Sequence, residues 1–160
     1  MAVVALRPLV RSDLDALFAM MRDPDSVHLA AFTAEDPNDR AAFNAHMERV
    51  LSSPGVTLRA VTADELFVGT VSSFPLEGDV EVSYWIDRSH WGRGIASEAL
   101  ALLLAEVTTR PLRARVASDN VASRRVLEKS GFVAIGTEVS YAPGRRRKVE
   151  ETILELRAAR

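Results

Sequence analysis

The chain has 160 residues, of which 48% are hydrophobic, a formal net charge of −2 and no cysteine. A chain of this length can bury roughly 70% of the surface that its unfolded form exposes, so we expect one domain over residues 1–160. Without cysteine, disulfides, thiolate metal sites and a covalent acyl-cysteine intermediate are excluded. The spacing of His, Asp and Glu suggests no metal site either.

The sequence also lacks the patterns of secreted and membrane proteins. Residues 1–8 contain no basic region followed by an apolar core. The longest apolar run, Ala99 to Ala105, is too short to span a bilayer. We therefore expect a soluble cytoplasmic protein with no membrane partner.

Hydrophobic periodicity predicts strands and helices in a mixed order. The expected strands cover residues 3–9, 56–62, 66–74, 80–87, 112–117, 132–141 and 148–156. The expected helices cover residues 13–22, 39–51, 95–108 and 120–130. This order predicts an α/β (α+β) fold, with about seven strands in one sheet and about four helices on its faces.

Local signals set the ends of the first two helices. Ser12 can cap the first helix, and Pro24 ends it. A connection that contains His28 leads to the second helix, which Pro54 and Gly55 stop.

The strand over residues 80–87 leads into a glycine-containing turn. Apolar Val82, Tyr84 and Ile86 share one face of this strand, and Glu81, Ser83 and Trp85 share the other. The turn that follows reads Trp91-Gly92-Arg93-Gly94-Ile95-Ala96 and opens an apolar helix. Glycines let the backbone turn tightly, so N–H groups can point into one concavity at the positive end of the helix. This arrangement predicts a phosphate site.

A dinucleotide-binding oxidoreductase is a competing interpretation of the same turn. Its fingerprint needs a third small residue where this chain has Ser97, and an acidic residue at the end of the next strand. That strand offers Arg113 and Arg115 instead. A P-loop is excluded because no Gly-Lys-Ser/Thr follows the turn.

A second motif supports the phosphate site. Asn120 and Ser123 lie three residues apart on a predicted helix that Gly131 and Phe132 can end. With the strand and turn before it, this pattern resembles the GNAT superfamily of acetyl-coenzyme A N-acetyltransferases over residues 80–133, and most of all its ribosomal-protein N-terminal acetyltransferase subgroup. The resemblance implies a sheet splayed at its central strands and direct acetyl transfer from acetyl-CoA to a primary amine.

The resemblance also implies roles for individual residues. The turn would hold the phosphates of the coenzyme with the backbone of residues 91–96, supplemented by Arg93. Free backbone groups of Tyr84 and Ile86 would pair with the pantetheine arm. Asn120 and Ser123 match the family's polar pair near the arm and the sulfur. The alternative is that Asn120 only caps its helix and Ser123 has no role.

Proton transfer is less clearly marked. Leu127 occupies the position of the family's Tyr general acid, so Ser123 or water would protonate the thiolate. Glu81 is the first candidate base, with an exposed strand carboxylate as the alternative, and His28 is the second. His28 and Trp85 are also candidates for contacts with the acceptor amine. His46 and His90 are interpreted as surface or packing residues.

Charge and partners complete the prediction. Residues 1–80 carry a net charge of −6 and residues 81–160 a net charge of +4, which suits a cationic amine and an anionic coenzyme, although chance scatter explains it equally well. The acceptor is a small molecule or a peptide N-terminus. Arg145 to Lys148 lack interleaved aromatics, so they predict a solvated turn and no nucleic-acid partner. The sequence does not decide whether the protein forms a homodimer. The alternative to an acetyltransferase is a non-catalytic coenzyme A sensor with the same fold.

Overall fold

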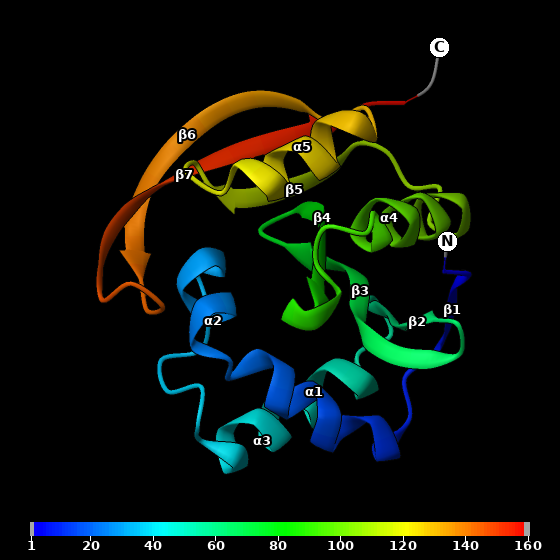
Figure 1. Cartoon of the computed structure of the whole chain (residues 1–160). Helices are drawn as coiled ribbons and strands as arrows, with labels where there is room; N and C mark the ends of the chain where they lie inside the picture. Colours follow the sequence, from blue (N-terminus) through cyan, green and yellow to red (C-terminus); the bar gives the residue numbers. More distant parts are fainter. Residues whose placement is uncertain (1, 159–160) are drawn as a thin grey trace.

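In the computed structural model, which describes residues 2–158, the strands form one seven-stranded sheet in the order β1-β2-β3-β4-β5-β7-β6 (Figure 1). Neighbouring strands are antiparallel except β4 and β5, which are parallel. The strands are β1 (Val4–Pro8), β2 (Thr57–Ala63), β3 (Leu66–Leu76), β4 (Asp79–Ile86), β5 (Leu112–Ala117), β6 (Val133–Ala142) and β7 (Arg147–Leu156). The helices are α1 (Leu14–Met21), α2 (Pro24–Ala30), α3 (Arg40–Ser52), α4 (Ile95–Glu106) and α5 (Val121–Lys129), with single 3-10 turns at Arg11–Asp13 and Arg88–His90.

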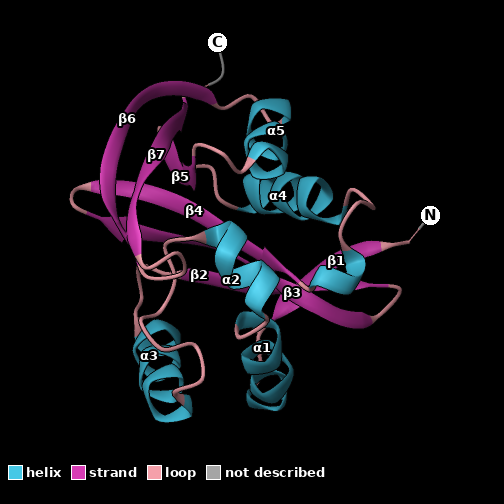
Figure 2. Ribbon diagram, turned by 60° about the vertical axis from the view of Figure 1, so that its left-hand side comes forward, coloured by secondary structure: helices cyan, strands magenta, loops and turns pink. Residues whose placement is uncertain are grey.

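Helices cover both faces of the sheet (Figure 2). α4 and α5 pack on one face, and α1 and α3 lie on the other. Successive residues of a strand point to opposite faces, so β2 contributes to both cores. Val61 packs with Leu100 of α4, whereas its neighbour Ala60 packs with Leu17 of α1 and Met47 of α3.

Asp13, not Ser12, fixes the start of the first helix. Its carboxylate accepts two hydrogen bonds of 2.8 Å from Arg7 and one of 2.9 Å from the N–H of Val10. The hydrogen bonds with Arg7 hold the pKa of Asp13 below its usual range. The expected Ser12 cap is therefore wrong, because Ser12 lies inside the 3-10 turn that precedes α1.

The expected connection around His28 is also wrong, because it forms a fifth α-helix, α2. Pro24 is the first residue of this helix, a position where the missing N–H costs nothing. The carboxylate of Asp23 caps it by accepting from the N–H of Ser26 at 3.0 Å. Both helix-start signals were present in the sequence, but the proline was interpreted only as a stop.

The sheet splays between β4 and β5, as the family resemblance implies. Within residues 2–158 these strands pair at one position only, Glu81 beside Arg113. The N–H of Asp87 donates to the carbonyl of Val68 in β3 at 2.8 Å, and alternate residues of an antiparallel strand bond to the same neighbour. The backbone groups of Tyr84 and Ile86 therefore point toward the gap that opens beside β5.

Candidate active site

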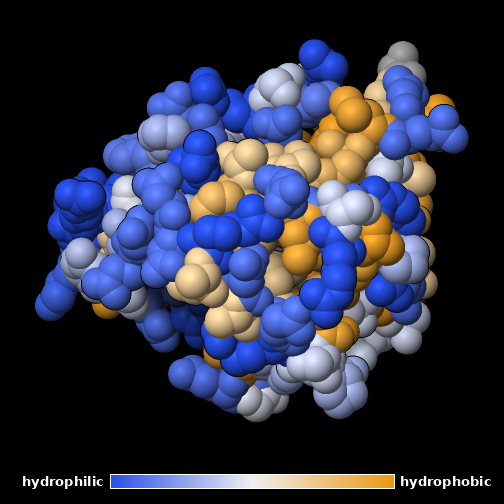
Figure 3. Space-filling model, turned by 90° about the horizontal axis from the view of Figure 1, so that it is seen from below, coloured by the Kyte–Doolittle hydropathy of each residue, from blue (hydrophilic) through white to orange (hydrophobic). Residues whose placement is uncertain are grey.

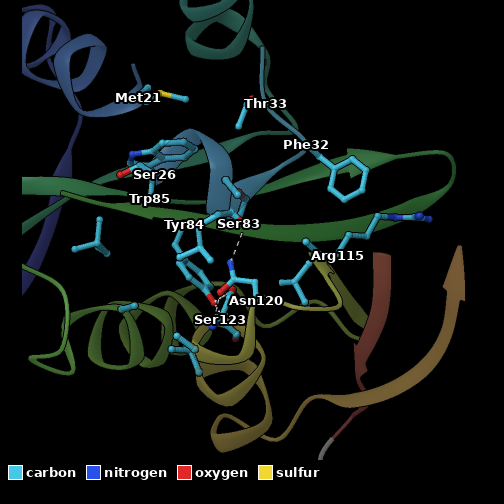
Figure 4. Close-up of a pocket in the computed structure, with 18 of the residues that line it drawn as sticks. Met21, Ser26, Phe32, Thr33, Ser83, Tyr84, Trp85, Arg115, Asn120 and Ser123 are labelled. Atoms are coloured by element: carbon cyan, nitrogen blue, oxygen red, sulfur yellow. Dashed lines mark hydrogen bonds between the residues drawn. The ribbon is translucent and has the colours of Figure 1, made fainter. Parts of the chain in front are cut away.

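A cavity of about 870 Å³ runs through the gap between β4 and β5 (Figure 4). On one side of the sheet its wall comes from the turn before α4 and from α5. On the other side it comes from α1, α2, the segment 32–39 and α3 as far as Arg49. We call the part beside the turn and α5 the donor end, and the part beside α1, α2 and α3 the acceptor chamber. Both faces of the sheet thus reach one continuous space.

Two glycines shape the donor end. Gly92 and Gly94 have φ of 76° and 75°, the left-handed region that glycine enters at no steric cost. A Cβ at either position would have no atom within 4 Å, so both glycines border open space. Gly94 is the N-cap of α4 and has no side chain to accept from the first N–H groups of the helix. These N–H groups and the helix dipole make the turn an anion site, which fits the phosphates of a coenzyme.

Trp91 holds this turn against the end of β4. Its indole N–H donates to the carbonyl of Ile86 at 2.8 Å. That donor is therefore not directed at a phosphate, and the Ile86 carbonyl already has a partner. The backbone of Tyr84 is left as the strand edge for an extended arm. Arg93 is exposed and does not line the cavity, whereas Trp91, Ile95 and Ala96 do.

Asn120 and Ser123 line the cavity beside Tyr84 (Figure 4). Asn120 is the N-cap of α5: its Oδ1 accepts from the N–H of Ser123 at 3.2 Å, and its Nδ2 donates to the carbonyl of Leu29 at 3.4 Å. Asn120 does cap the helix, and it also ties α5 to α2. Ser123 also has a side-chain partner: its Oγ lies 2.6 Å from the hydroxyl of Tyr84, within hydrogen-bond distance.

The hydroxyl of Tyr84 is the functional group that the sequence interpretation missed. The carbonyl of Ser123 lies 3.1 Å away, so the single hydroxyl hydrogen of Tyr84 can be donated either to this carbonyl or to Ser123 Oγ. Burial raises the pKa of Tyr84 to about 12, so the hydroxyl keeps its proton at neutral pH. Leu127, at the position of the family's Tyr acid, is fully buried. The available signal was strand parity, which placed Tyr84 with Val82 on the face that α4 and α5 cover.

Glu81 does not line the cavity, although it lies on the expected face of β4. It is 4% exposed, and its Oε2 accepts from Nε of Arg115 at 3.2 Å. Glu138 and Glu151 each accept from Nη1 of the same guanidinium at 3.0 Å. Burial raises the pKa of Glu81, and the hydrogen bond from Arg115 opposes that shift. Because Arg115 stands between Glu81 and the cavity, the geometry does not support direct contact of Glu81 with an amine.

Among the histidines, His28 lies outside the cavity, whereas His46 is exposed and His90 half-buried, as expected of surface or packing residues. His28 is exposed on α2 and does not line the cavity. His46 and His90, interpreted as surface or packing residues, both line it. Burial and the neighbouring Arg49 lower the pKa of His46. Trp85 lines the acceptor chamber as proposed.

Comparison with known proteins identifies the family and the fold. Residues 4–133 match the model of the acetyltransferase (GNAT) domain. The chain belongs to the GNAT acetyltransferase family. It is 32% identical over 124 residues to "Probable N-acetyltransferase YjcK" of Bacillus subtilis (strain 168). The matched region covers 72% of this chain and 65% of YjcK. It is 37% identical over 68 residues to the ribosomal-protein-serine acetyltransferase of Escherichia coli (strain K12), 39% of this chain and 37% of that protein.

A solved structure shares the whole fold of this GNAT chain. The microcin C7 self-immunity acetyltransferase MccE, in complex with acetyl-CoA and AMP, superposes with a TM-score of 0.80 over 96% of this chain and 92% of MccE. The two sequences are 13% identical, so the likeness concerns the fold. None of the helices between residues 2 and 158 is both long and apolar enough to cross a bilayer. In the same part of the chain, no group of three His, Asp or Glu side chains is placed to hold a metal ion.

Arg145 corrects the expectation of a solvated basic turn in this GNAT domain. Its side chain is only 3% exposed, and its Nη1 and Nη2 donate to the carboxylate of Asp119 at 2.5 and 2.7 Å. Its Nε donates to the carbonyl of His28 at 2.7 Å. A Cβ on the preceding Gly144 would lie 2.4 Å from the carbonyl of Val27. The tip of the β6–β7 hairpin is therefore docked on α2, beside the acceptor chamber.

We expect Arg145→Ala to lower the free energy of unfolding by about 1–3 kcal/mol, because it leaves the His28 carbonyl and the Asp119 carboxylate without this partner. For a chain of this size that loss lowers the melting temperature by roughly 2–10 °C. Arg146→Ala is the matched control, since Arg146 is the exposed neighbour on the same turn. Thermal unfolding of the two variants measures the difference. Equal melting temperatures would show that the docked tip contributes no stability.

Proposed function

We propose that this GNAT chain transfers the acetyl group of acetyl-CoA directly to the α-amine of a peptide or protein. The observation that carries the proposal is the continuous cavity, which joins an anion-binding turn to a separate acceptor chamber through the splay of β4 and β5. Acetyl-CoA supplies a thioester whose C–S bond breaks as the new C–N bond forms. The acetyl-CoA held by MccE supports this donor, and the serine acetyltransferase of E. coli supports a protein amine as acceptor.

Residues of the donor end bind and orient the donor. The N–H groups at the start of α4 hold the phosphates, with Gly92 and Gly94 leaving room for their approach. The exposed edge of β4 at Tyr84 pairs with the amide groups of the pantetheine arm, as an added strand would. A backbone N–H at this edge also stabilises the negative charge that develops on the thioester oxygen, a contribution of roughly 2.7–4 kcal/mol per donor.

Ser123 gives its hydroxyl proton to the departing sulfur and regains one from the solvent, which takes up the proton that the amine loses. Tyr84 positions Ser123. The Tyr84 hydroxyl and Ser123 Oγ, 2.6 Å apart, exchange donor and acceptor roles without moving heavy atoms. When Tyr84 donates to Oγ, the hydroxyl hydrogen of Ser123 is free to turn into the cavity. A thiol of pKa near 8.5 is a fair leaving group, so one such donor is sufficient.

The acceptor amine needs no dedicated base on this wall. An α-amine has a pKa of about 7.7–8.0, compared with about 10.4 for lysine, so a substantial fraction is already neutral at physiological pH. Since Arg115 separates Glu81 from the cavity, we assign deprotonation to solvent. The requirement for a neutral amine then favours α-amines over lysine side chains.

This assignment predicts that the pH dependence of kcat/KM follows the acceptor. The rate should rise with pH and level off above the pKa of the amine used, so an amine of higher pKa should shift the rise by the same interval. Glu81→Gln keeps the shape of the side chain and should leave both the profile and the rate within about threefold. A rise at one fixed pH for all amines, lost in Glu81→Gln, would restore Glu81 as the base.

The function itself is tested by incubating the chain with acetyl-CoA and a mixture of peptides and amines. Free thiol should be released in step with an acetylated product, identified by mass. Saturable binding of acetyl-CoA without thiol release from any mixture would instead indicate a coenzyme A sensor.

A further inference from the structure

The acceptor chamber has an apolar, largely aromatic wall. It is lined by Phe18 and Met21 of α1, Leu29 of α2, Phe32, Phe43 of α3 and Trp85 of β4. Figure 4 shows Met21 and Trp85 on one side of the chamber and Phe32 on the other. Viewed from the side of α1 and α3, apolar surface is visible between hydrophilic side chains (Figure 3). Aromatic walls of this kind bind apolar groups of a ligand and fix their orientation.

Part of this wall is held in place by contacts within the protein. The rings of Phe18 and Phe43 lie 5.2 Å apart at an interplanar angle of 60°, a favourable tilted contact. The guanidinium of Arg40 stacks over both rings, at 5.1 and 5.6 Å from their centroids. Arg40 is held in turn by Asp15 and Asn44, at 2.8 and 2.9 Å. The two rings therefore form a fixed surface rather than a flexible lid.

Two polar atoms in the chamber wall are buried without a partner, Nε1 of Trp85 and Oγ1 of Thr33. Their residues come from β4 and from the segment that follows α2, and both line the cavity. Neither atom has accessible surface, so its side chain must move slightly before a polar group of a ligand can pair with it. Because a buried polar group left unpaired is costly, such pairing favours a ligand that carries polar groups beside its apolar ones.

The carboxylates of the chamber attract an amine that is still protonated when it enters, before it loses its proton and reacts. Asp36 and Asp39 line it at the start of α3. The positive charge of Arg115 is offset by Glu81, Glu138 and Glu151, which surround its guanidinium. Arg49 is the second arginine that lines the cavity, and it lies in the last turns of α3, away from Asp36 and Asp39. Carboxylates at this end attract cations and repel acidic side chains.

We propose that the preferred acceptor is an α-amine whose own residue carries an aromatic or large aliphatic side chain and continues into an amide, as at the N-terminus of a peptide beginning with Phe or Leu. The side chain fills the apolar wall, and the amine points to the gap between β4 and β5. This inference rests on the proposed function. A first residue as small as Ala or Ser would leave the aromatic wall exposed to water.

Aminoacyl amides test the inference, because their α-amines have similar pKa values and differ mainly in the side chain. The chain is incubated with acetyl-CoA and phenylalaninamide, leucinamide, alaninamide or the α-amide of glutamate, and kcat/KM is taken from thiol release with product mass. Full burial of a side chain such as Phe or Leu predicts kcat/KM roughly 10- to 150-fold above that of alaninamide. The glutamate amide should be the poorest acceptor.

Two tryptophan substitutions on α3 locate the effect. Ala42 lines the chamber and Ala41, its exposed neighbour, does not. Ala42→Trp should fill the chamber and bring the ratio of phenylalaninamide to alaninamide close to one, whereas Ala41→Trp should keep the wild-type ratio. Turnover of all four amides within about threefold, or a preference for alaninamide, overturns the inference and leaves the proposed function standing. Absence of any acetylated amine, with acetyl-CoA still bound, overturns both.

Discussion

Acetyl-CoA at about 100 times its dissociation constant should stabilise the wild-type chain by roughly 2.7 kcal/mol, and Gly94→Ala should lose most of that stabilisation. In a chain of this size the wild-type shift is about 5–10 °C in melting temperature. The reason is steric and electrostatic at once: a Cβ at Gly94 would project into the open space before the first N–H groups of α4, where the phosphates approach. Thermal unfolding with and without acetyl-CoA measures both shifts.

Backbone strain is the competing explanation, because alanine at positive φ costs about 1–2 kcal/mol wherever it occurs. Gly78 provides the matched control. It has φ of 87°, also faces open space, and lies in the turn between β3 and β4 away from the cavity. Gly78→Ala should therefore lose comparable intrinsic stability but keep the full shift with acetyl-CoA. An undiminished shift in Gly94→Ala would remove the turn from the donor site.

Ser123→Ala and Tyr84→Phe should each reduce kcat by roughly 10²- to 10⁴-fold, and the double variant should be little worse than either single one. The two residues act as a unit because their hydroxyl oxygens are 2.6 Å apart, so the direction of the Ser123 hydroxyl hydrogen depends on where Tyr84 donates its own. Loss of the Tyr84 hydroxyl also removes its bond to the Ser123 carbonyl, which should cost only about 1 kcal/mol of stability. Rates per folded molecule separate the two effects.

The dependence on the leaving group distinguishes proton donation from packing. With an acetyl thioester of a more acidic thiol, the sulfur needs less help to depart, so the defect of both variants should shrink markedly. A purely structural role would give the same defect with every donor. Tyr141→Phe serves as the control, since Tyr141 is 56% exposed and does not line the cavity. Full activity of Ser123→Ala with acetyl-CoA would exclude the pair from the mechanism.

Short-range patterns located the turn before α4 and the start of α5. The turn before α4 and the cap of α5 depend on residues within a few positions of one another, so glycine and asparagine spacing was sufficient to locate them. The order of strands and helices along the chain followed from hydrophobic periodicity. The mixed sheet followed from that order and from the family resemblance. The splay at β4 came from the resemblance alone, and the pairing at Glu81 and Arg113 confirms it.

Side-chain contacts between residues far apart in the chain could not be predicted from the sequence. Glu81 and Arg115 are 34 residues apart, so strand parity gave the face of Glu81 but not the guanidinium that covers it. Arg145 meets Asp119 across 26 residues, and a run of basic residues therefore looked like a solvated turn. Tyr84 meets Ser123 across 39 residues. Each contact depends on how β5, β7 and the helices pack, which local pattern does not determine.

The two ends of the cavity are encoded by separate stretches of the chain. Apart from the strand residues of β4 and β5, the acceptor chamber comes from residues 18–49, and the donor end comes from residues 90–127. Substitutions in the first stretch can therefore change which amine is accepted while the coenzyme site keeps its sequence. Exchanging residues 18–49 between relatives of this fold is accordingly a route to new acceptor specificity on an unchanged donor half.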